Sequence, residues 1–462
     1  MTMIKSISGI RGTIGGKLGE GLTPLDVVRY SSAFGAFIKH RQNQQKIKIV
    51  VGRDARISGD MVNRLVNNAL IGMGIDVVDL GLSTTPTVEI AVTTLHAHGG
   101  IIITASHNPR EWNALKLLNE NGEFLSADDG LQVLEIAEQN AMVFADVDHL
   151  GRYATYEHFV KDHVDKILSL SLVDVDAIKK AGFRIVVDCI NSTGAIAIPP
   201  LLKALGVENI ELLNGDPTGE FAHNPEPLPG HLTAIAQKVV AKKADVGFVV
   251  DPDVDRLAIV SETGEMFGEE YTLVAVADYV LQHQKGNTVS NLSSSRALRD
   301  ISEQAGVEYH AAAVGEVNVV EKMKEVKAVI GGEGNGGVIY PELHYGRDAL
   351  VGIALFLSYL AKSDKTVSGI RKQYPAYVIQ KSKIKLNPDM DVDAVLLKMK
   401  DKYQSYPVST IDGVRIEFDK EWVHMRKSNT EPIIRIYAES KTSEAATILA
   451  NRFIDEISEL DV

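Results

Sequence analysis

Short apolar runs recur along most of the chain, and each is followed by a polar or glycine-rich turn. Continuous apolar runs with such ends are typical of buried strands rather than of half-exposed ones. These runs predict strands at 75–80, 99–103, 183–188, 246–250 and 326–330, and the alternating residues 46–51 predict a further strand.

Amphipathic segments lie between these runs and predict helices. A helix that opens at Ser58 and runs to about Gly72 would place Met61, Leu65 and Leu70 roughly on one face. Strands that alternate with helices form parallel or mixed sheets covered by helices. The pattern therefore predicts an α/β fold.

The pattern changes near residue 373. Strands are predicted at 376–385 and 414–418, and helices at 392–403 and 443–457, with little βαβ regularity. This mixture predicts a separate α+β domain after three related α/β domains. The expected domains are 1–155, 156–257, 258–372 and 373–462.

Composition excludes several classes of function. A chain of 462 residues is too long for one core, so several domains are expected. Its net charge of −13 argues against nucleic acid or an anionic membrane as a partner, but not against a small anion in a local basic pocket. The single cysteine, Cys189, excludes an intrachain disulfide. With no signal sequence or membrane span visible, we expect a soluble cytoplasmic protein.

The loop after the run 99–103 carries the first candidate for chemistry, Ser106. Pro109 stops the strand and biases Asn108 toward extended or turn geometry. Ser106 is therefore expected at the carboxyl end of a buried strand, where α/β sheets bind ligands. A hydroxyl there suits a nucleophile or a covalent carrier, although such a stretch in isolation is more often an ordinary turn.

Three carboxylates follow the strand at 246–250 at alternate positions. In an extended turn, Asp251, Asp253 and Asp255 would point the same way and repel one another unless a cation or protons neutralise them. Hard oxygen ligands with an incomplete shell suit Mg²⁺. The Arg256 guanidinium could then donate two hydrogen bonds to a phosphate that bridges the metal. The alternative is an acidic surface turn.

Two further cations are candidates for contact with a phosphate. Arg11 stands among glycines that would let the backbone approach a ligand. Lys116 follows the Ser106 loop, and near a metal and a phosphate its pKa could be lowered so that it moves protons. A surface loop and a solvated lysine are the plainer interpretations.

Two later loops have the composition of recognition sites. Glu333 and Asn335 project from a glycine-rich segment and could match neighbouring sugar hydroxyls. The stretch 426–432, with Arg435 beyond it, gathers arginines, a lysine and hydroxyls into an anion trap within an acidic protein. A flexible loop and a wet basic turn are the alternatives.

Together these stretches resemble the four signature motifs of the α-D-phosphohexomutase superfamily. The motifs, in order, are Thr104-Ala-Ser-His-Asn-Pro, Asp251-Pro-Asp-Val-Asp-Arg, Gly332-Glu-Gly-Asn-Gly-Gly and Arg426-Lys-Ser-Asn-Thr-Glu-Pro. The resemblance spans nearly the whole chain. It implies a four-domain protein, three related α/β domains plus a C-terminal α+β domain, in which each domain gives one loop to a central cleft.

The resemblance also implies a role for each motif residue. The implied set is phosphoserine at Ser106; Mg²⁺ ligands Ser106, Asp251, Asp253 and Asp255; catalytic cations Arg11, Lys116 and Arg256; sugar-binding Glu333 and Asn335; and phosphate-binding Arg426, Ser428, Asn429, Thr430 and Arg435. The implied reaction moves a phosphoryl group between the 6- and 1-positions of a hexose or hexosamine phosphate. It passes through glucose or glucosamine 1,6-bisphosphate, which also acts as activator. The implied partners are small sugar phosphates, and the implied assembly is a monomer or homodimer.

One position departs from the pattern. Many relatives end the sugar-binding loop in histidine, but here the residue is Gly337, so a second acid or base is unassigned. The loop resembles the archaeal-like branch, which includes phosphoglucosamine mutases and phosphomannomutase/phosphoglucomutases. The resemblance favours glucosamine 6-phosphate as substrate, with the hexose phosphates as the alternative.

Three other functions stay open from the sequence. A haloacid dehalogenase-type phosphatase would use Asp251 and Asp253 without needing Ser106. A serine hydrolase would pair Ser106 with His107, but adjacent side chains on a strand point apart and the Gly-x-Ser-x-Gly elbow is absent. A sugar-phosphate sensor would keep the scaffold without turnover.

Overall fold

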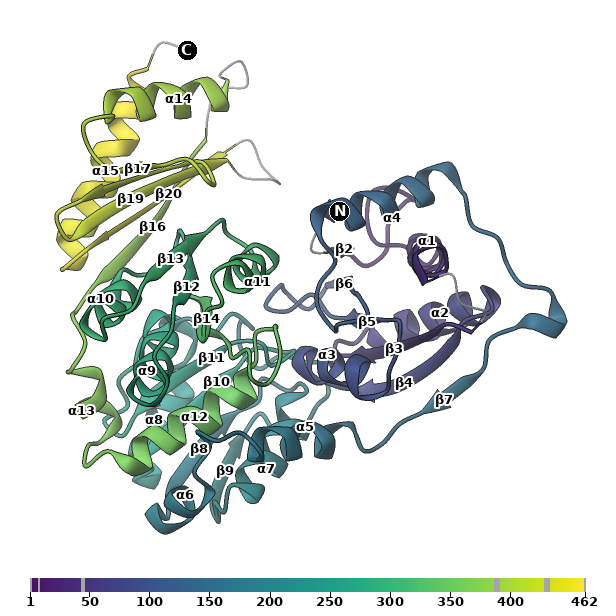
Figure 1. Cartoon of the computed structure of the whole chain (residues 1–462), viewed down its shortest axis with the longest axis horizontal. Helices are drawn as coiled ribbons and strands as arrows, with labels where there is room; N and C mark the ends of the chain where they lie inside the picture. Colours follow the sequence, from purple (N-terminus) through teal and green to yellow (C-terminus); the bar gives the residue numbers. More distant parts are fainter. Residues whose placement is uncertain (1, 7–8, 43–45, 386–390, 428–432, 461–462) are drawn as a thin grey trace. The chain divides into compact units, whose positions relative to one another are not determined.

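The computed structural model describes residues 2–6, 9–42, 46–385, 391–427 and 433–460. They form two compact units, whose helices and strands are labelled in Figure 1. The first unit comprises Met1–Tyr279 and Asn335–Ile370, and the second comprises Val280–Gly334 and Arg371–Val462.

The first unit holds a seven-stranded mixed sheet in the order β1-β2-β6-β5-β3-β4-β7. Its strands are β1 (Met3–Ser6), β2 (Gly9–Thr13), β3 (Lys48–Arg53), β4 (Asp76–Leu82), β5 (Gly99–Ile103), β6 (Trp112–Leu118) and β7 (Tyr153–Thr155). Pairings among β5, β3, β4 and β7 are parallel, whereas β6 runs antiparallel to both β5 and β2. This sheet places β2, which carries Arg11, and β5, which leads into the turn of Ser106, on either side of β6, which carries Lys116.

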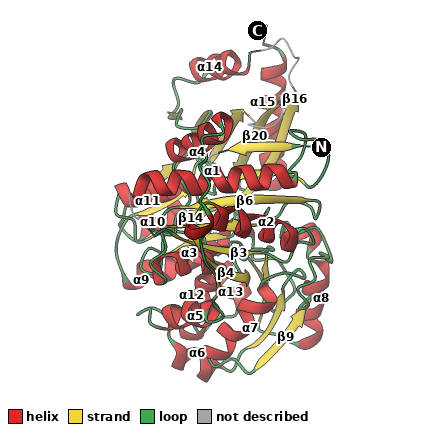
Figure 2. Cartoon of the chain, turned by 90° about the vertical axis from the view of Figure 1, so that its right-hand side faces the viewer, coloured by secondary structure: helices red, strands yellow, loops and turns green. Residues whose placement is uncertain are grey.

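Helices cover both faces of this sheet (Figures 1 and 2). Ile49 and Val51 of β3 pack in a core with α1 (Pro24–Gln42), α2 (Gly59–Gly72) and α4 (Ala127–Gln139). Val50, which points the other way, packs in a second core with α3 (Thr85–Thr94). Alternate residues of a strand face opposite sides, so one apolar strand supplies both cores.

Helix α2 forms where predicted, but it buries a different face. Its buried apolar row is Val62, Val66 and Leu70, whereas Met61 is 39% exposed. Positions four apart lie on one face of a helix, and the row from Val62 meets that spacing better than the predicted row from Met61.

The second sheet of the first unit has the order β11-β10-β8-β9. Strands β8 (Arg184–Asp188), β9 (Asn209–Leu213) and β10 (Val246–Val250) are parallel, and β11 (Leu257–Ser261) is antiparallel to β10. The same unit contains α5 (Phe159–Leu168), α6 (Val175–Ala181), α7 (Gly194–Ala204), α8 (Thr233–Lys242), β15 (Gly337–Ile339) and α12 (Ala349–Lys362). Helices α9 (Glu269–His283) and α13 (Val367–Arg371) run across the division between the units.

The second unit contains two groups of strands. In the first group β12 (Thr288–Asn291) pairs in parallel with β13 (Tyr309–Ala312) and β14 (Ile330–Glu333), beside α10 (Ala297–Gln304) and α11 (Glu316–Glu325). In the second, an antiparallel sheet has the order β16-β20-β19-β18-β17. Its elements are β16 (Val378–Lys385), β17 (Val408–Ser409), β18 (Val414–Phe418), β19 (Glu421–Lys427), β20 (Ile433–Ser440), α14 (Val392–Lys402) and α15 (Ser443–Ser458).

The predicted strand at 326–330 is wrong in its position. Val326 ends α11, and the strand runs from Ile330 to Glu333. Gly331 therefore belongs to the strand rather than to a turn. A Cβ at Gly331 would lie 2.5 Å from the sulfur of Met323 and 2.8 Å from the carbonyl oxygen of Val289, so this glycine permits close packing.

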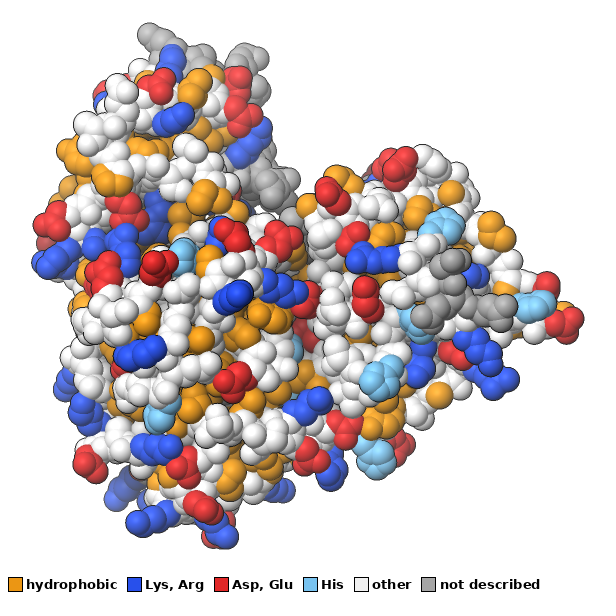
Figure 3. Space-filling view, in the orientation of Figure 1, with side chains coloured by type: hydrophobic (Ala, Val, Ile, Leu, Met, Phe, Trp, Pro, Cys, Tyr) orange, Lys and Arg blue, Asp and Glu red, His pale blue; other side chains and the backbone are white. Residues whose placement is uncertain are grey.

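The predicted fold class is confirmed, because helix-covered mixed and parallel strands precede an antiparallel sheet flanked by two helices. Within the described ranges, the helices are all too short or too polar to cross a membrane. Over the face drawn in Figure 3, lysine and arginine side chains are interspersed with acidic ones.

Candidate active site

Ser106 lies on the turn after β5 and is 7% exposed. Its φ of +48° is in the left-handed region, which is uncommon for a residue other than glycine and often marks a functional site. Its backbone N–H donates to the hydroxyl of Thr104 at 2.9 Å, and that hydroxyl donates to Asp54 at 2.7 Å. The turn is therefore held by side chains in a single conformation.

Arg56, a buried residue of the loop after β3, stabilises the turn that carries Ser106. The Arg56 guanidinium donates to the backbone carbonyls of Ser106, Asn108, Pro109 and Trp112. Its Nε pairs with Asp54 at 3.0 Å, and both side chains are fully buried. One guanidinium can satisfy several carbonyls in this way because its N–H groups form a rigid fork.

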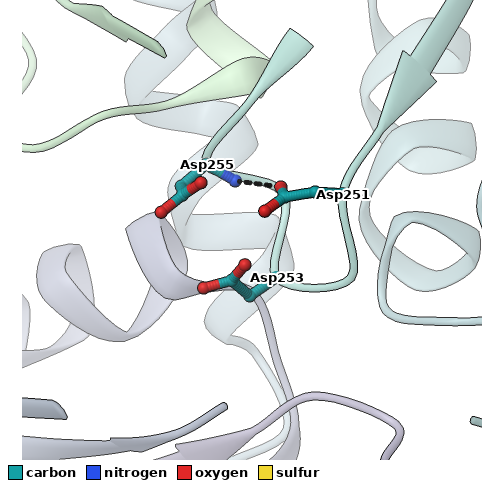
Figure 4. Close-up of side chains that lie close together, drawn as sticks. All are labelled: Asp251, Asp253 and Asp255. Atoms are coloured by element: carbon teal, nitrogen blue, oxygen red, sulfur yellow. Dashed lines mark hydrogen bonds between the residues drawn. The ribbon is translucent and has the colours of Figure 1, made fainter. Parts of the chain in front are cut away.

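The three predicted carboxylates converge on the turn after β10 (Figure 4). One oxygen from each of Asp251, Asp253 and Asp255 lies within 4.8 Å of the others, and all three residues are buried. The turn is curled, so the convergence does not arise from the extended geometry that was considered from the sequence. Val254 has a φ of +62°, and the backbone N–H groups of Asp255 and Arg256 both donate to Asp251 Oδ1 at 3.2 Å.

Ser106 contacts the turn 251–255, which is called the acidic turn from here on. The Ser106 hydroxyl donates to Asp251 Oδ2 at 2.7 Å. Burial raises the pKa of Asp251 well above its usual range, and the nearby charges of Asp255 and Asp253 raise it further. A divalent cation or a compensating proton would relieve this repulsion.

Lys116, on β6, is part of the site and not a solvated lysine. Its ammonium donates to Asp253 Oδ2 at 2.7 Å and lies 3.6 Å from Asp255. Burial opposes the charge on Lys116, but Asp253 and Asp255 outweigh it and raise the lysine pKa. The lowered pKa considered from the sequence requires a bound metal and a phosphate beside the lysine, and it stays a prediction. Burial likewise opposes the charge on Asp253, yet Lys116 and the hydroxyl of Thr85 lower its pKa.

The donor set fits a hard divalent cation. Asp253 Oδ1 and Asp255 Oδ1 are buried, and neither accepts a hydrogen bond from any group in the described part of the chain. A buried carboxylate oxygen without a partner costs free energy, and a metal ion would satisfy both at once. Oxygen ligands from carboxylates suit Mg²⁺.

Three arginines, Arg11, Arg256 and Arg347, lie near enough to His107, the residue after the serine, to affect its pKa. Burial lowers the pKa of His107 to about 2, and Arg256 and Arg347 contribute to this lowering. Burial and the neighbouring Arg256 also lower the pKa of Arg11, which lies on β2 rather than in the predicted loop. Cations that disfavour one another in this way create a site for an anion such as a phosphoryl group.

The proximity of Ser106 and His107 differs from the strand-based expectation. Their side chains do not point apart, because Ser106 lies on a turn, and Oγ is 3.4 Å from His107 Nδ1. The shorter contact of the hydroxyl is nevertheless the one to Asp251. The geometry therefore ties the serine to the acidic turn more closely than to an imidazole base.

The two residues of the glycine-rich loop have separate environments. Glu333 ends β14 in the second unit, and its Oε1 accepts from the Asn291 side chain at 2.8 Å and from the Gly315 N–H at 3.3 Å. Asn335 belongs to the first unit, and its Oδ1 accepts from the N–H of Gly337 at 3.2 Å.

The basic loop of the last domain is described in part. Arg426 on β19 lies opposite Arg435 on β20 in the antiparallel register, and its Nη1 is 3.7 Å from Asp412. Two arginines at facing positions repel unless an anion or carboxylate lies nearby. The other three predicted phosphate ligands, Ser428, Asn429 and Thr430, lie outside the described residues.

Family models cover the chain in four consecutive segments. Residues 3–143, 161–264 and 268–377 match the phosphoglucomutase/phosphomannomutase α/β/α domains I, II and III, and residues 381–456 match the C-terminal domain of that family. The chain belongs to the phosphoglucomutase/phosphomannomutase family. The predicted superfamily is thereby confirmed, and the protein is a phosphohexomutase, an isomerase that acts as an intramolecular phosphotransferase.

Named relatives of this phosphohexomutase span almost its full length. A phosphoglucomutase/phosphomannomutase of Thermococcus kodakarensis is 36% identical over 94% of the chain and 95% of that relative. A probable phosphoglucosamine mutase of Methanopyrus kandleri is 32% identical over 97% and 96%. A crystal structure of a phosphoglucomutase/phosphomannomutase family protein from Burkholderia thailandensis superposes with a TM-score of 0.84 at 25% identity, covering 99% of each chain.

Three residues of the phosphohexomutase site were not predicted. Thr85 donates to Asp253 Oδ2 at 2.6 Å, Arg347 donates to Asp255 Oδ2 at 2.7 Å, and Arg56 holds the serine turn. Thr85 begins a helix and Arg347 precedes one, so each looks like an ordinary helix start in the sequence. A clue for Arg56 was the polar cluster after a buried strand, the same signal that identified Ser106.

Proposed function

We propose that this phosphohexomutase carries its phosphoryl group on Ser106 and exchanges it with a sugar 1,6-bisphosphate. The observation that supports the proposal most is the 2.7 Å hydrogen bond between Ser106 and Asp251, in a site with three buried carboxylates. The cations of this site are Arg11, Lys116, Arg256 and Arg347. In the transfer, a sugar hydroxyl oxygen forms a bond to phosphorus as the bond from phosphorus to Ser106 Oγ breaks. The proton of the sugar hydroxyl is passed to Ser106 Oγ, so the products are a sugar phosphate ester and a free serine hydroxyl with no net release of a proton.

The residues of the chain would divide this work. Arg11 and Arg256, near the serine, would offset the charge on the moving phosphoryl group, for which positioning and electrostatics supply most of the catalysis. Lys116 would lie next to the leaving oxygen and the acidic turn. Glu333 and Asn335 would bind sugar hydroxyls, and Arg426, Ser428, Asn429, Thr430 and Arg435 would hold the phosphate that does not react.

Mg²⁺ is the proposed metal. Asp251, Asp253 and Asp255 would hold it together with an oxygen of the phosphorylated serine. Bound there, Mg²⁺ would supply charge stabilisation as a Lewis acid on the phosphoryl oxygens. The partnerless oxygens of Asp253 and Asp255 support this assignment.

The proposed substrate is glucosamine 6-phosphate, converted to glucosamine 1-phosphate through the 1,6-bisphosphate. The alternative is a mannose or glucose phosphate, since the named relatives divide between the two classes. The lone buried Cys189 supports action in a reducing cytoplasm. The proposed partners are small sugar phosphates, and the proposed assembly is a monomer or homodimer. The domain limits 1–155, 156–257, 258–372 and 373–462 stay a prediction.

Turnover of each sugar phosphate by the wild-type protein and by Ser106→Ala tests this function. We expect the wild type to interconvert the 1- and 6-phosphates, with glucosamine phosphate preferred, and the variant to be inactive. Phosphate release that persists in Ser106→Ala would favour a phosphatase acting through Asp251. Binding of sugar phosphates without interconversion would indicate a sensor instead.

A further inference from the structure

Each carboxylate of the acidic turn has an oxygen engaged by a hydrogen-bond donor of the protein, and for Asp255 that donor is Arg347. Arg347 Nη2 donates to Asp255 Oδ2 at 2.7 Å, and the arginine is 7% exposed. The other oxygen, Asp255 Oδ1, accepts no hydrogen bond from the described residues. Asp255 Oδ2 is therefore occupied by its hydrogen bond with Arg347, and Asp255 Oδ1 is available to a metal ion.

Arg347 is itself fixed in place by the backbone around it. The next residue, Asp348, caps α12 through its side chain, and its N–H donates to the carbonyl of Val338 at 2.8 Å. A Cβ built on Gly337 would lie 2.4 Å from Cδ and 3.0 Å from Cγ of Arg347. The stem of Arg347 thus occupies the space that any side chain at position 337 would need, which accounts for the glycine there.

A committed oxygen limits how a carboxylate can bind a cation. Mg²⁺ takes six ligands in a near-ideal octahedron and is satisfied by one oxygen from each carboxylate, whereas Ca²⁺ takes more ligands and accepts both oxygens of one carboxylate. We propose that Arg347 determines the cation preference of this site by holding Asp255 Oδ2, so that Asp255 offers a single oxygen and the site favours Mg²⁺ over Ca²⁺. The proposal rests on the proposed metal site at the acidic turn.

Comparing the affinities of the site for Mg²⁺ and for Ca²⁺ distinguishes the effect of the Arg347 hydrogen bond from the effect of the Arg347 charge. Loss of the arginine charge changes the attraction of the site for every divalent cation by a similar factor, because Mg²⁺ and Ca²⁺ carry the same charge. The ratio of the two affinities is insensitive to that change but sensitive to the number of oxygens that Asp255 can offer. Arg256 supplies a matched control, since its Nε lies 3.9 Å from Asp255 Oδ1, beyond hydrogen-bond distance.

The experiment measures displacement of bound Mn²⁺ by Mg²⁺ and by Ca²⁺, followed by electron paramagnetic resonance of free Mn²⁺. Full-length protein is used in one phosphorylation state, verified by intact mass. In Arg347→Met we expect the Ca²⁺ affinity relative to the Mg²⁺ affinity to rise about tenfold, a size typical of losing the partner of a metal ligand. Arg256→Met should leave the ratio unchanged.

Gly337→Ala provides a second way to disrupt the hydrogen bond between Arg347 and Asp255. Its methyl group would displace the Arg347 stem, so we expect a similar rise in relative Ca²⁺ affinity, and no further rise in the double variant with Arg347→Met. An unchanged ratio in Arg347→Met that still binds Mn²⁺ overturns the inference alone. Failure of wild-type protein to bind Mn²⁺ more tightly than Asp253→Asn overturns the proposed metal site beneath it.

Discussion

The hydroxyl of Ser106 and the carboxylate of Asp251 lie 2.7 Å apart although 145 residues separate them in the chain. The serine lies on the turn after β5 of the first sheet, and the aspartate lies on the turn after β10 of the second. The proposed phosphate carrier and the proposed metal site are therefore built from two different sheets of the same unit. Any movement between those sheets would change the distance between Ser106 and Asp251, on which the proposed phosphoryl transfer depends.

Lys116→Met should reduce turnover by about 10²–10³-fold, because the site loses a cation aimed at developing charge. The free enzyme should also lose about 3–5 kcal/mol of unfolding free energy, since Asp253 would remain buried without its ionic partner. Added Mg²⁺ should recover part of that stability. Urea denaturation with and without Mg²⁺, together with kcat, checks both expectations, and Lys116→Arg serves as the charge-preserving control. Full activity in Lys116→Met would contradict the assigned role.

Arg56→Lys should be almost as damaging as Arg56→Ala. A lysine keeps the charge beside Asp54 but cannot form the fork that reaches the carbonyls of the loop 106–112. We expect a loss of about 3–5 kcal/mol of unfolding free energy, measured by urea denaturation, because each buried carbonyl left without a donor costs about 1–3 kcal/mol. Arg64→Lys, on an exposed face of α2, is the control for a general arginine effect. Equal stability of Arg56→Lys and wild type would show that the fork is dispensable.

His344 should make stability fall as the pH rises above neutrality. Burial lowers its pKa, but Asp348 and Glu89 outweigh burial and raise it to about 10, and His163 is the other titratable group packed there. A pKa raised on folding means that the folded state keeps a proton that the unfolded chain has lost. The stabilisation is complete below about pH 6.5 and disappears as the pH approaches about 10.

The measurement for His344 is the unfolding free energy between pH 6.5 and 10 in the wild type and in His344→Gln. The wild type should lose up to about 1.4 kcal/mol per pH unit from this group, and the variant should lack that part of the slope. His149→Gln, an exposed histidine beside Asp146, is the matched control. Identical slopes in wild type and His344→Gln would contradict the assignment.

The local pattern of apolar and polar residues was sufficient to predict the parts of the site that consist of one strand and the turn after it. The run 246–250 is apolar at every position and is followed at once by carboxylates, so both β10 and the acidic turn could be predicted. Ser106 was found in the same way. The α2 face was missed because Met61 and Val62 are both apolar, and only packing against the sheet decides which one is buried.

Contacts between distant segments could not be predicted. Arg347 reaches Asp255 across 92 residues, and Thr85 reaches Asp253 across 168, with no local signal in either segment. The sign of the pKa shift of Lys116 likewise depends on Asp253, which the sequence does not place next to it. The curl of the acidic turn depends on Val254 adopting a left-handed conformation that its type disfavours.

The most direct test of the central claim is the intact mass of the purified protein before and after incubation with glucose 1,6-bisphosphate and Mg²⁺, with peptide mapping of the modified residue. The account predicts that one phosphoryl group is gained, that it maps to Ser106, and that a sugar monophosphate acceptor removes it. Ser106→Ala should gain none. A mapped phosphoryl group on any other residue, or full mutase activity in Ser106→Ala, would contradict the account.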